Sequence, residues 1–244
     1  MFALASSARA ELIVRGDLFV RFAGGIAPTA LPRHAPAPVE VRVSSTVRVL
    51  SGNHPPPLRR ITIALNGAGH LDSRGLPRCP VARIRATDDL AALAACRSAL
   101  VGEGRYRATA AYPEQTAFPS QGRILAFNAI VGGRRAILAH VHGGDPVQTF
   151  IVVFRIRSGT GTYGTTLTGS LPKSTNPYGS VTHFSLDLHR NYTYLGHRHS
   201  YISAACAAPP GFTRAIFPFA RVSMSFEDGR TLSSSLSRSC RVRG

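Results

Sequence analysis

Apolar and polar residues alternate along most of this chain. In the stretch 39–50, valines recur at nearly every second position and polar residues fill the positions between them. A period of two predicts a strand that buries one face and exposes the other. Ile61, Ile63 and Leu65 repeat the pattern after a turn at 53–57, where three prolines cannot donate to a strand ladder.

Short, glycine-containing turns separate several pairs of alternating segments. Glycine allows the positive φ angles that tight hairpin turns require, so these pairs are predicted to form antiparallel hairpins. The expected hairpins are 11–23 around Gly16-Asp17, 123–142 around Gly132-Gly133, 150–171, and 220–239 around Asp228-Gly229. A further pair is expected between 181–189 and 199–204.

One helix is expected, over residues 88–101. Thr87 is a good N-cap, and Asp88 and Asp89 place negative charge at the positive end of the helix dipole. Gly102 is a suitable stop. The predicted buried stripe consists of Leu93, Cys96 and Leu100.

These elements predict an all-β fold, an antiparallel β-sandwich or flattened barrel of about 11–12 strands with one short helix. The connections are too short for parallel crossovers. Three segments are expected: the residual end of a signal peptide (1–10), an N-terminal hairpin with a proline-rich linker (11–38), and a single β domain (39–244).

The four cysteines indicate an oxidising compartment. Their number is even and none forms a C-x-x-C pair, and Ala8-Arg9-Ala10 has the small-x-small form of a signal-peptidase site. The chain is therefore expected to be exported, with no apolar run long enough to span a bilayer. Four cysteines allow three pairings, and the pairing of neighbours, Cys79–Cys96 and Cys206–Cys240, closes the shortest loops.

The formal net charge is +17, and 28 of the 29 basic residues are arginine. The arginines are scattered along strands without a dense basic run, which argues against nucleic acid as the partner. Two alternatives are a solvated basic surface and a site for an anionic polysaccharide or cell-envelope polymer. The candidate anion-binding residues are Arg42, Arg48, Arg60, Arg155 and Arg157.

Histidines on alternating positions form a second candidate site. His183, Asp187 and His189 share one strand face, and His197 and His199 share another. If the two segments pair, their side chains could converge to hold Zn²⁺ or Cu²⁺. The alternatives are acid–base catalysis and ordinary polar residues on a solvent-facing sheet.

Two enzyme motifs occur in unsuitable surroundings. The G-x-G-x-x-G string at 159–164 precedes residues typical of a strand, whereas a nucleotide site needs a helix there. The S-x-x-K string at 170–173 contains Pro172, which opposes the helical turn that this chemistry requires. No motif therefore predicts an enzyme.

Three parts of the chain carry a resemblance to known sequences. They are Phe118-Pro-Ser-Gln-Gly-Arg-Ile-Leu-Ala-Phe-Asn128, Gly133-Arg-Arg-Ala-Ile-Leu-Ala-His140, and the region from Tyr201 to Cys240. On these strings the chain resembles a family of uncharacterised exported proteins from high-GC actinobacteria. That family has no assigned activity, so the resemblance implies export and a shared β fold. The leading hypothesis is a secreted, disulfide-stabilised β module that binds an anionic polymer, and the alternative is a metal-binding protein or metal-dependent enzyme.

Overall fold

The alternating segments form strands in the computed structural model, which describes residues 10–52, 54–145, 147–172 and 179–243. The described part contains 18 strands, and 13 of them belong to one sheet. All but Ala10 of the expected signal-peptide end, and Lys173 of the S-x-x-K string, lie outside the described residues.

The first half of the chain contains β1 (Glu11–Arg15), β2 (Leu18–Ala27), β3 (Ala30–Leu31), β4 (Ala37–Pro38), β5 (Glu40–Val49), β6 (Leu58–Asn66), β7 (Gly69–Leu71), β8 (Leu100–Ala110) and β9 (Phe118–Val131). The second half contains β10 (Arg134–Gly144), β11 (Val147–Ser158), β12 (Tyr163–Ser170), β13 (Gly179–Leu188), β14 (Asn191–Tyr194), β15 (His197–Ser200), β16 (Ile202–Ala204), β17 (Arg214–Phe226) and β18 (Thr231–Val242). The all-β, mainly antiparallel prediction is confirmed. The strand count exceeds the expected 11–12, because strands of two to four residues are too short to show a period of two.

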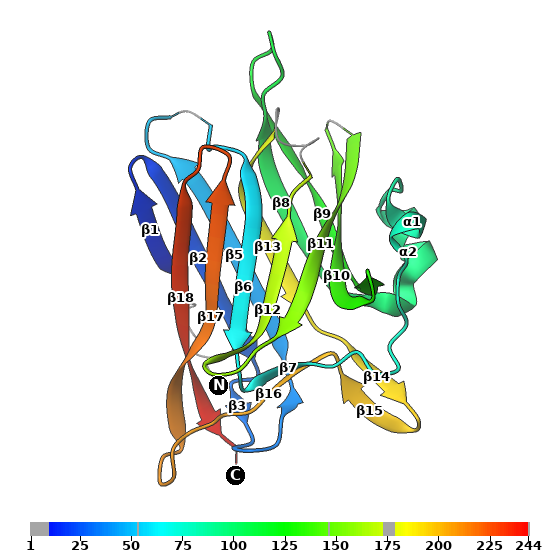
Figure 1. Cartoon of the computed structure of the whole chain (residues 1–244), viewed down its shortest axis with the longest axis vertical. Coiled ribbons are helices and arrows are strands. Elements are labelled where there is room, and N and C mark those ends of the chain that lie inside the picture. Colours follow the sequence, from blue (N-terminus) through cyan, green and yellow to red (C-terminus); the bar gives the residue numbers. More distant parts are fainter. Residues whose placement is uncertain (1–9, 53, 146, 173–178, 244) are drawn as a thin grey trace, which may run out of the picture.

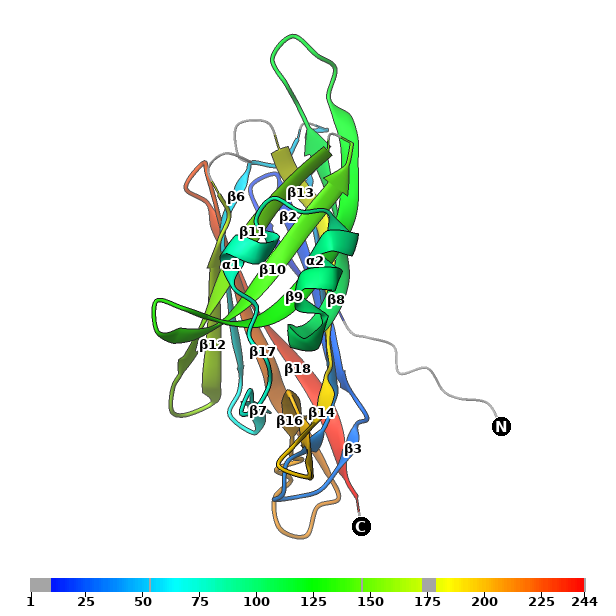
Figure 2. The same ribbon diagram turned by 90° about the vertical axis from the view of Figure 1, so that its right-hand side faces the viewer.

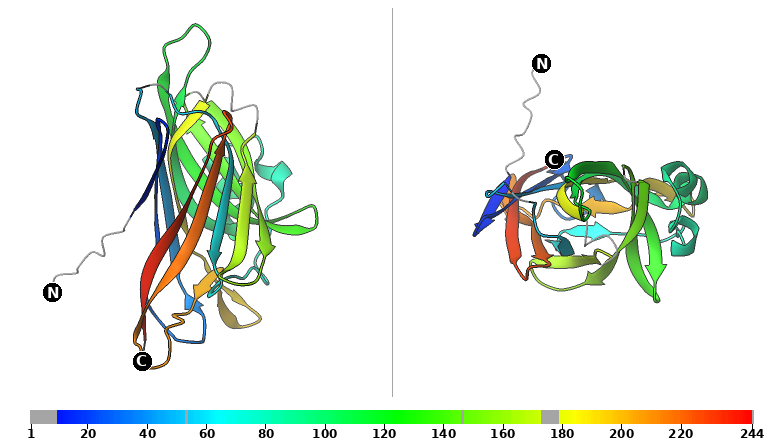
Figure 3. Two further views of the ribbon diagram at one scale, coloured as in Figure 1. Left: turned by 60° about the vertical axis from the view of Figure 1, so that its left-hand side comes forward. Right: turned by 90° about the horizontal axis from the view of Figure 1, so that it is seen from above.

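The large sheet curls into two facing layers, as Figures 1 and 3 show. Its strand order is β1-β2-β5-β13-β8-β9-β10-β11-β12-β6-β17-β18-β3. Strands β2, β5, β13 and β8 form the rear layer in Figure 1, and β12, β6, β17 and β18 form the front layer. This curled sheet corresponds to the flattened barrel, one of the two architectures expected from the sequence.

Arginine side chains bridge the two ends of the curled sheet. Arg15 Nη1 donates to the Thr231 carbonyl oxygen at 3.1 Å, and Arg238 donates to the carbonyl of Gly24. Arg230 pairs with Asp17, 2.6 Å from Nη1 to Oδ1. Within the described residues no backbone ladder joins β1 or β2 to β18, so these side chains tie the seam together.

The main core lies between the layers. Valines of β5 point inward as predicted, with Val41 and Val47 buried against residues such as Val222 and Met224 of β17. Burying apolar side chains from both layers provides most of the favourable free energy of folding. The polar alternates point outward and leave both outer faces rich in arginine, serine and threonine.

Two short helices cover the outer side of β9 and β10 (Figure 2). They are α1 (Val81–Ile84) and α2 (Asp89–Cys96), and a 3₁₀ turn follows α2. Asp88 caps α2, because its carboxylate accepts the Ala91 N–H at 2.8 Å, and so Thr87 is not the N-cap expected from the sequence. The helices bury Leu125 and Phe127, so β9 is covered on both of its faces.

Segment 181–189 does not pair with 199–204, so this predicted hairpin is wrong. Strand β13 lies between β5 and β8, and β15 pairs with β14 in a separate two-stranded sheet. The short strand β16 pairs with β4 and β7. Alternation alone cannot identify a partner strand, and here β13 pairs with strands far away in the sequence.

Both disulfides form between neighbouring cysteines, as predicted. Cys79–Cys96 joins the segment before α1 to the end of α2, and Cys206–Cys240 joins the segment after β16 to β18. The N-terminal hairpin is part of the large sheet, since β2 pairs with β5 along its whole length. Among the described residues, no helix is long and apolar enough to cross a membrane.

Candidate functional site

A groove of about 410 Å³ runs along the outer face of the rear layer, where β13, β8 and β9 lie side by side. This volume falls within the range of small-molecule sites. The residues that line this arginine groove are Arg105, Tyr106, Arg107, Gln121, Gly122, Arg123, His183 and Ser185. None of them is acidic, so the groove is chemically suited to an anion.

Strand register assembles the groove from distant parts of the chain. Thr46, His183 and Arg107 are successive partners on β5, β13 and β8, and Arg21 on β2 extends the row. Partners in an antiparallel sheet project from the same face, about 4.8 Å apart from strand to strand. Arg21 and Arg107 therefore stand at the two ends of this row, with the hydroxyl of Thr46 and the imidazole of His183 between them.

A second row lies beside the first. It consists of Ser44, Ser185, Arg105 and Arg123. The two rows together contain four guanidinium groups, three hydroxyl groups and one imidazole, and all three kinds of group can donate hydrogen bonds to an oxyanion.

The groove arginines differ in their partners. Arg123 Nη2 lies 2.9 Å from Glu103 Oε2, and its Nε lies 4.0 Å from Asp89 Oδ2 at the start of α2. In the part of the chain that the structure describes, Arg105 and Arg107 form neither an ion pair nor a side-chain hydrogen bond. Their ten N–H donors are therefore open to a ligand.

His183 lies between these arginines and β5. Its Nδ1 is 3.2 Å from Thr46 Oγ1. Partial burial and the positive charge of Arg107 lower the pKa of His183 below its usual value. The imidazole is therefore neutral at pH 7, and an anion bound nearby would favour its protonation.

The five arginines proposed from the sequence lie on two opposite faces. Arg42 and Arg48 alternate with the buried valines of β5 and belong to the same layer as the groove. Arg60 lies on β6 in the other layer, and Arg155 and Arg157 lie on β11, where they pair with residues of β12 in that layer. Arg42 is paired with Glu40 at 2.8 Å and with Asp187 at 3.5 Å, which leaves it less available to a ligand.

Sequence reasoning missed the arginines that the fold gathers. Arg105 and Arg107 flank Tyr106 at a period of two, which marks them as outward residues around an inward one. That alternation was the available signal. Their proximity to Arg123 and His183 could not be predicted from the sequence, because it depends on the pairing of β8 with β9 and with β13.

The residues proposed for a metal site are held by different elements. His183 and Asp187 lie on β13 in the large sheet, His189 follows this strand, and His197 and His199 lie on β15. His199 stacks on Tyr192 with ring centroids 5.5 Å apart. In the described ranges, no three His, Cys, Asp or Glu side chains lie close enough together to hold one metal ion.

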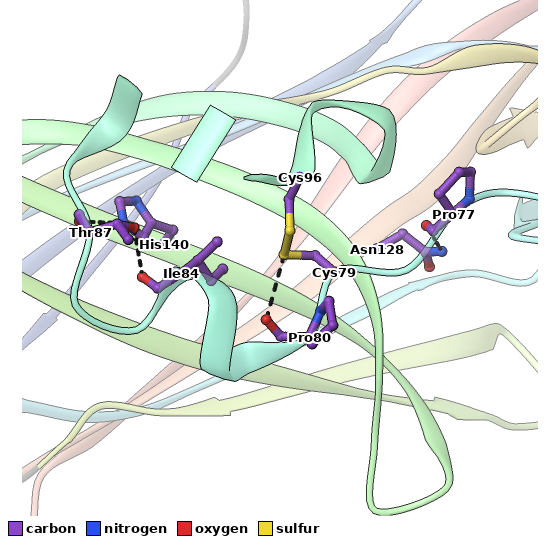
Figure 4. Close-up of a disulfide and its surroundings, with 8 residues drawn as sticks. All are labelled: Pro77, Cys79, Pro80, Ile84, Thr87, Cys96, Asn128 and His140. Carbon is purple, nitrogen blue, oxygen red and sulfur yellow. Dashed lines mark hydrogen bonds between the residues drawn. A yellow bond between two sulfur atoms is a disulfide. The ribbon is translucent and has the colours of Figure 1, made fainter. Parts of the chain in front are cut away.

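A polar clasp of Thr87, Asp89, His140 and Thr149 joins the helical segment to the sheet, and Figure 4 shows Thr87 and His140 of this clasp. The Thr87 carbonyl lies 2.9 Å from His140 Nε2 and accepts the Thr149 hydroxyl at 2.9 Å. His140 is fully buried, and its Nδ1 lies 3.7 Å from Asp89 Oδ1. Asp89 thus lies between His140 in the clasp and Arg123 in the groove, whose Nε is 4.0 Å from Asp89 Oδ2.

Acid is expected to weaken this clasp. Burial lowers the pKa of His140, and Thr87 and Asp89 offset only part of that effect. Between the folded and unfolded pKa values the unfolded chain binds more protons, so the free energy of unfolding should fall as the pH drops below about 6.5. Urea unfolding from pH 8 to pH 5 measures this fall.

The variant His140→Gln isolates the contribution of this residue, because an amide can still donate to the Thr87 carbonyl. It should lose less stability than the wild type over the same pH range. The free energy of unfolding of the double variant His140→Gln/His183→Gln should depend even less on pH, because the pKa of His183 is also lowered. The same change of unfolding free energy with pH in all three proteins would contradict the role given to His140.

In comparisons with known proteins, no protein-family model, no curated protein and no solved structure matches this chain.

Proposed function

We propose that this chain is an exported β module that binds an acidic polysaccharide in the arginine groove. The observation that carries the proposal is the pair Arg105 and Arg107, whose guanidinium groups lack ion pairs in the described structure and stand in a groove lined by no acid. Guanidinium groups bind carboxylate and sulfate through two parallel hydrogen bonds. The two disulfides and the small-x-small string ending at Ala10 support export.

A polymer fits the layout better than a single small anion. The row from Arg21 to Arg107 spans four strands, a distance of about 14 Å at the usual strand spacing. Repeating charges along a polysaccharide can reach several of these groups at once, and each contact that is weak alone then adds to the affinity. The hydroxyls of Thr46 and Ser185 can bond to sugar hydroxyls between the charges.

Nucleic acid is disfavoured as the ligand by the groove lining. Proteins that hold single strands stack bases on exposed aromatic rings. Tyr106 is the only aromatic residue among those that line the groove, and it is buried, 5% exposed. The groove therefore offers charge and hydroxyl groups without a stacking surface.

The test is binding to polygalacturonate, with neutral dextran as the comparison polymer, at low and at physiological salt. Affinity should fall steeply with salt, since the contacts are ionic and exposed. The variant Arg105→Gln/Arg107→Gln should bind about tenfold more weakly. Absence of binding at low ionic strength would refute the proposal.

A matched control separates the groove from net charge. Arg155→Gln/Arg157→Gln removes the same two charges from the opposite layer and should reduce affinity much less. Equal losses in the two variants would show that binding is a general effect of the +17 charge.

Binding should also strengthen as pH falls from 8 to 5.5, because a bound anion favours protonated His183. The variant His183→Gln should lose that dependence.

A further inference from the structure

A cavity of about 90 Å³ lies inside the flattened barrel, between its two layers. Residues of both layers line it, among them Tyr106 and Phe184 from the rear layer and Phe150 and Phe154 from β11. Protein interiors are close-packed and contain few voids larger than a water molecule. At about 30 Å³ for each water in the liquid, this cavity has the volume of about three waters.

The lining is hydrocarbon. All 15 of the described residues that line the cavity are apolar or aromatic, and among them Tyr106 alone has a polar side-chain atom. Its hydroxyl lies beside Gly143, where a Cβ would approach it to 2.1 Å, and it has no hydrogen-bond partner in the described structure. A buried water needs two to four polar partners, so the cavity is unsuited to water.

We propose that this cavity binds part of an uncharged hydrocarbon group, with about three carbon atoms inside it, either the edge of a single ring or the end of an alkyl chain. Such a group would restore the dispersion contacts that the lining side chains lack around a void. The aromatic rings of Phe150, Phe154 and Phe184 provide the walls. The arginine groove lies on the outer face of the sheet, and Tyr106 is the residue that lines both sites.

Benzene and n-hexane are the probes, and methyl NMR is the measurement. Both should shift the methyl resonances of Ile124 and Val141, which line the cavity, and should leave Leu31 in the lower core unchanged. Tighter binding of benzene would identify the ligand as a ring, and tighter binding of n-hexane would identify it as the end of a chain.

Filling the cavity should abolish binding. Ala139 lines it on β10, and Ala139→Leu adds three carbon atoms at that point. Ala139→Val is the smaller alternative if the leucine variant does not fold. The matched control is Ala64→Leu, which makes the same change on β6 outside the cavity and should bind benzene like the wild type.

The proposal fails if neither benzene nor n-hexane shifts the cavity methyls near its solubility limit. It also fails if a folded Ala139→Leu or Ala139→Val variant binds benzene with unchanged affinity. Binding that also moves Leu31 would place the probe outside this cavity and would overturn the assignment.

Discussion

Replacement of Cys206 and Cys240 by alanine is expected to lower the free energy of unfolding by about 4 kcal/mol. The disulfide closes a loop of 34 residues, and a cross-link of this length removes about that much chain entropy from the unfolded state. Both cysteines are buried, and Cys206 donates its backbone N–H to the Pro32 carbonyl. Guanidinium unfolding monitored by circular dichroism measures the change.

The other disulfide provides the comparison. Cys79–Cys96 closes 17 residues, so Cys79→Ala/Cys96→Ala should cost about 3 kcal/mol. Limited proteolysis of that variant should cut first near α1 and α2, because this bond joins the two ends of the helical segment. A smaller loss for the longer loop than for the shorter one would contradict the chain-entropy explanation.

Gly122→Ala is expected to destabilise the protein by about 3 kcal/mol and to weaken polygalacturonate binding. A Cβ at this position would lie 1.9 Å from the His142 carbonyl oxygen on β10. The obstacle is backbone, so β9 and β10 would have to move apart. Gly122 also lines the arginine groove, and that movement would displace Arg123.

Gly144→Ala is the matched control, on the strand that Gly122→Ala would displace. A Cβ there meets no atom within 4 Å, and the residue is exposed at the end of β10. Its free energy of unfolding should stay within about 0.5 kcal/mol of the wild type, because alanine suits an extended chain at least as well as glycine. Comparable losses for Gly122→Ala and Gly144→Ala in urea unfolding would rule out the backbone contact as the cause.

The sequence of β9 and β10 carries the pattern of strands that are buried on both faces. Residues 124–129 and 136–141 are buried without interruption, and both runs are almost wholly apolar in the sequence. Continuous apolar runs are typical of strands covered on both faces. They predict a second layer outside the barrel, which the helices α1 and α2 supply.

The alternation of apolar and polar residues was sufficient to predict the hairpins between strands that follow one another in the chain. The hairpins β1–β2, β9–β10, β11–β12 and β17–β18 were predicted because side-chain period and turn glycines act between neighbours in sequence. The neighbouring disulfide pairs follow from the same locality. The prediction failed at β13, whose partners β5 and β8 are both distant in sequence.

By itself, then, the sequence determined the β class, four of the five expected hairpins, the cysteine pairs and the outward direction of the arginines. Those properties depend on residues close together in the chain. Only the tertiary structure decided that His183 meets Arg107, that Arg105 lies beside Arg123, and that a void remains inside the barrel. The order of strands in a sheet is set by the packing of the whole core, and that order creates both the groove and the cavity.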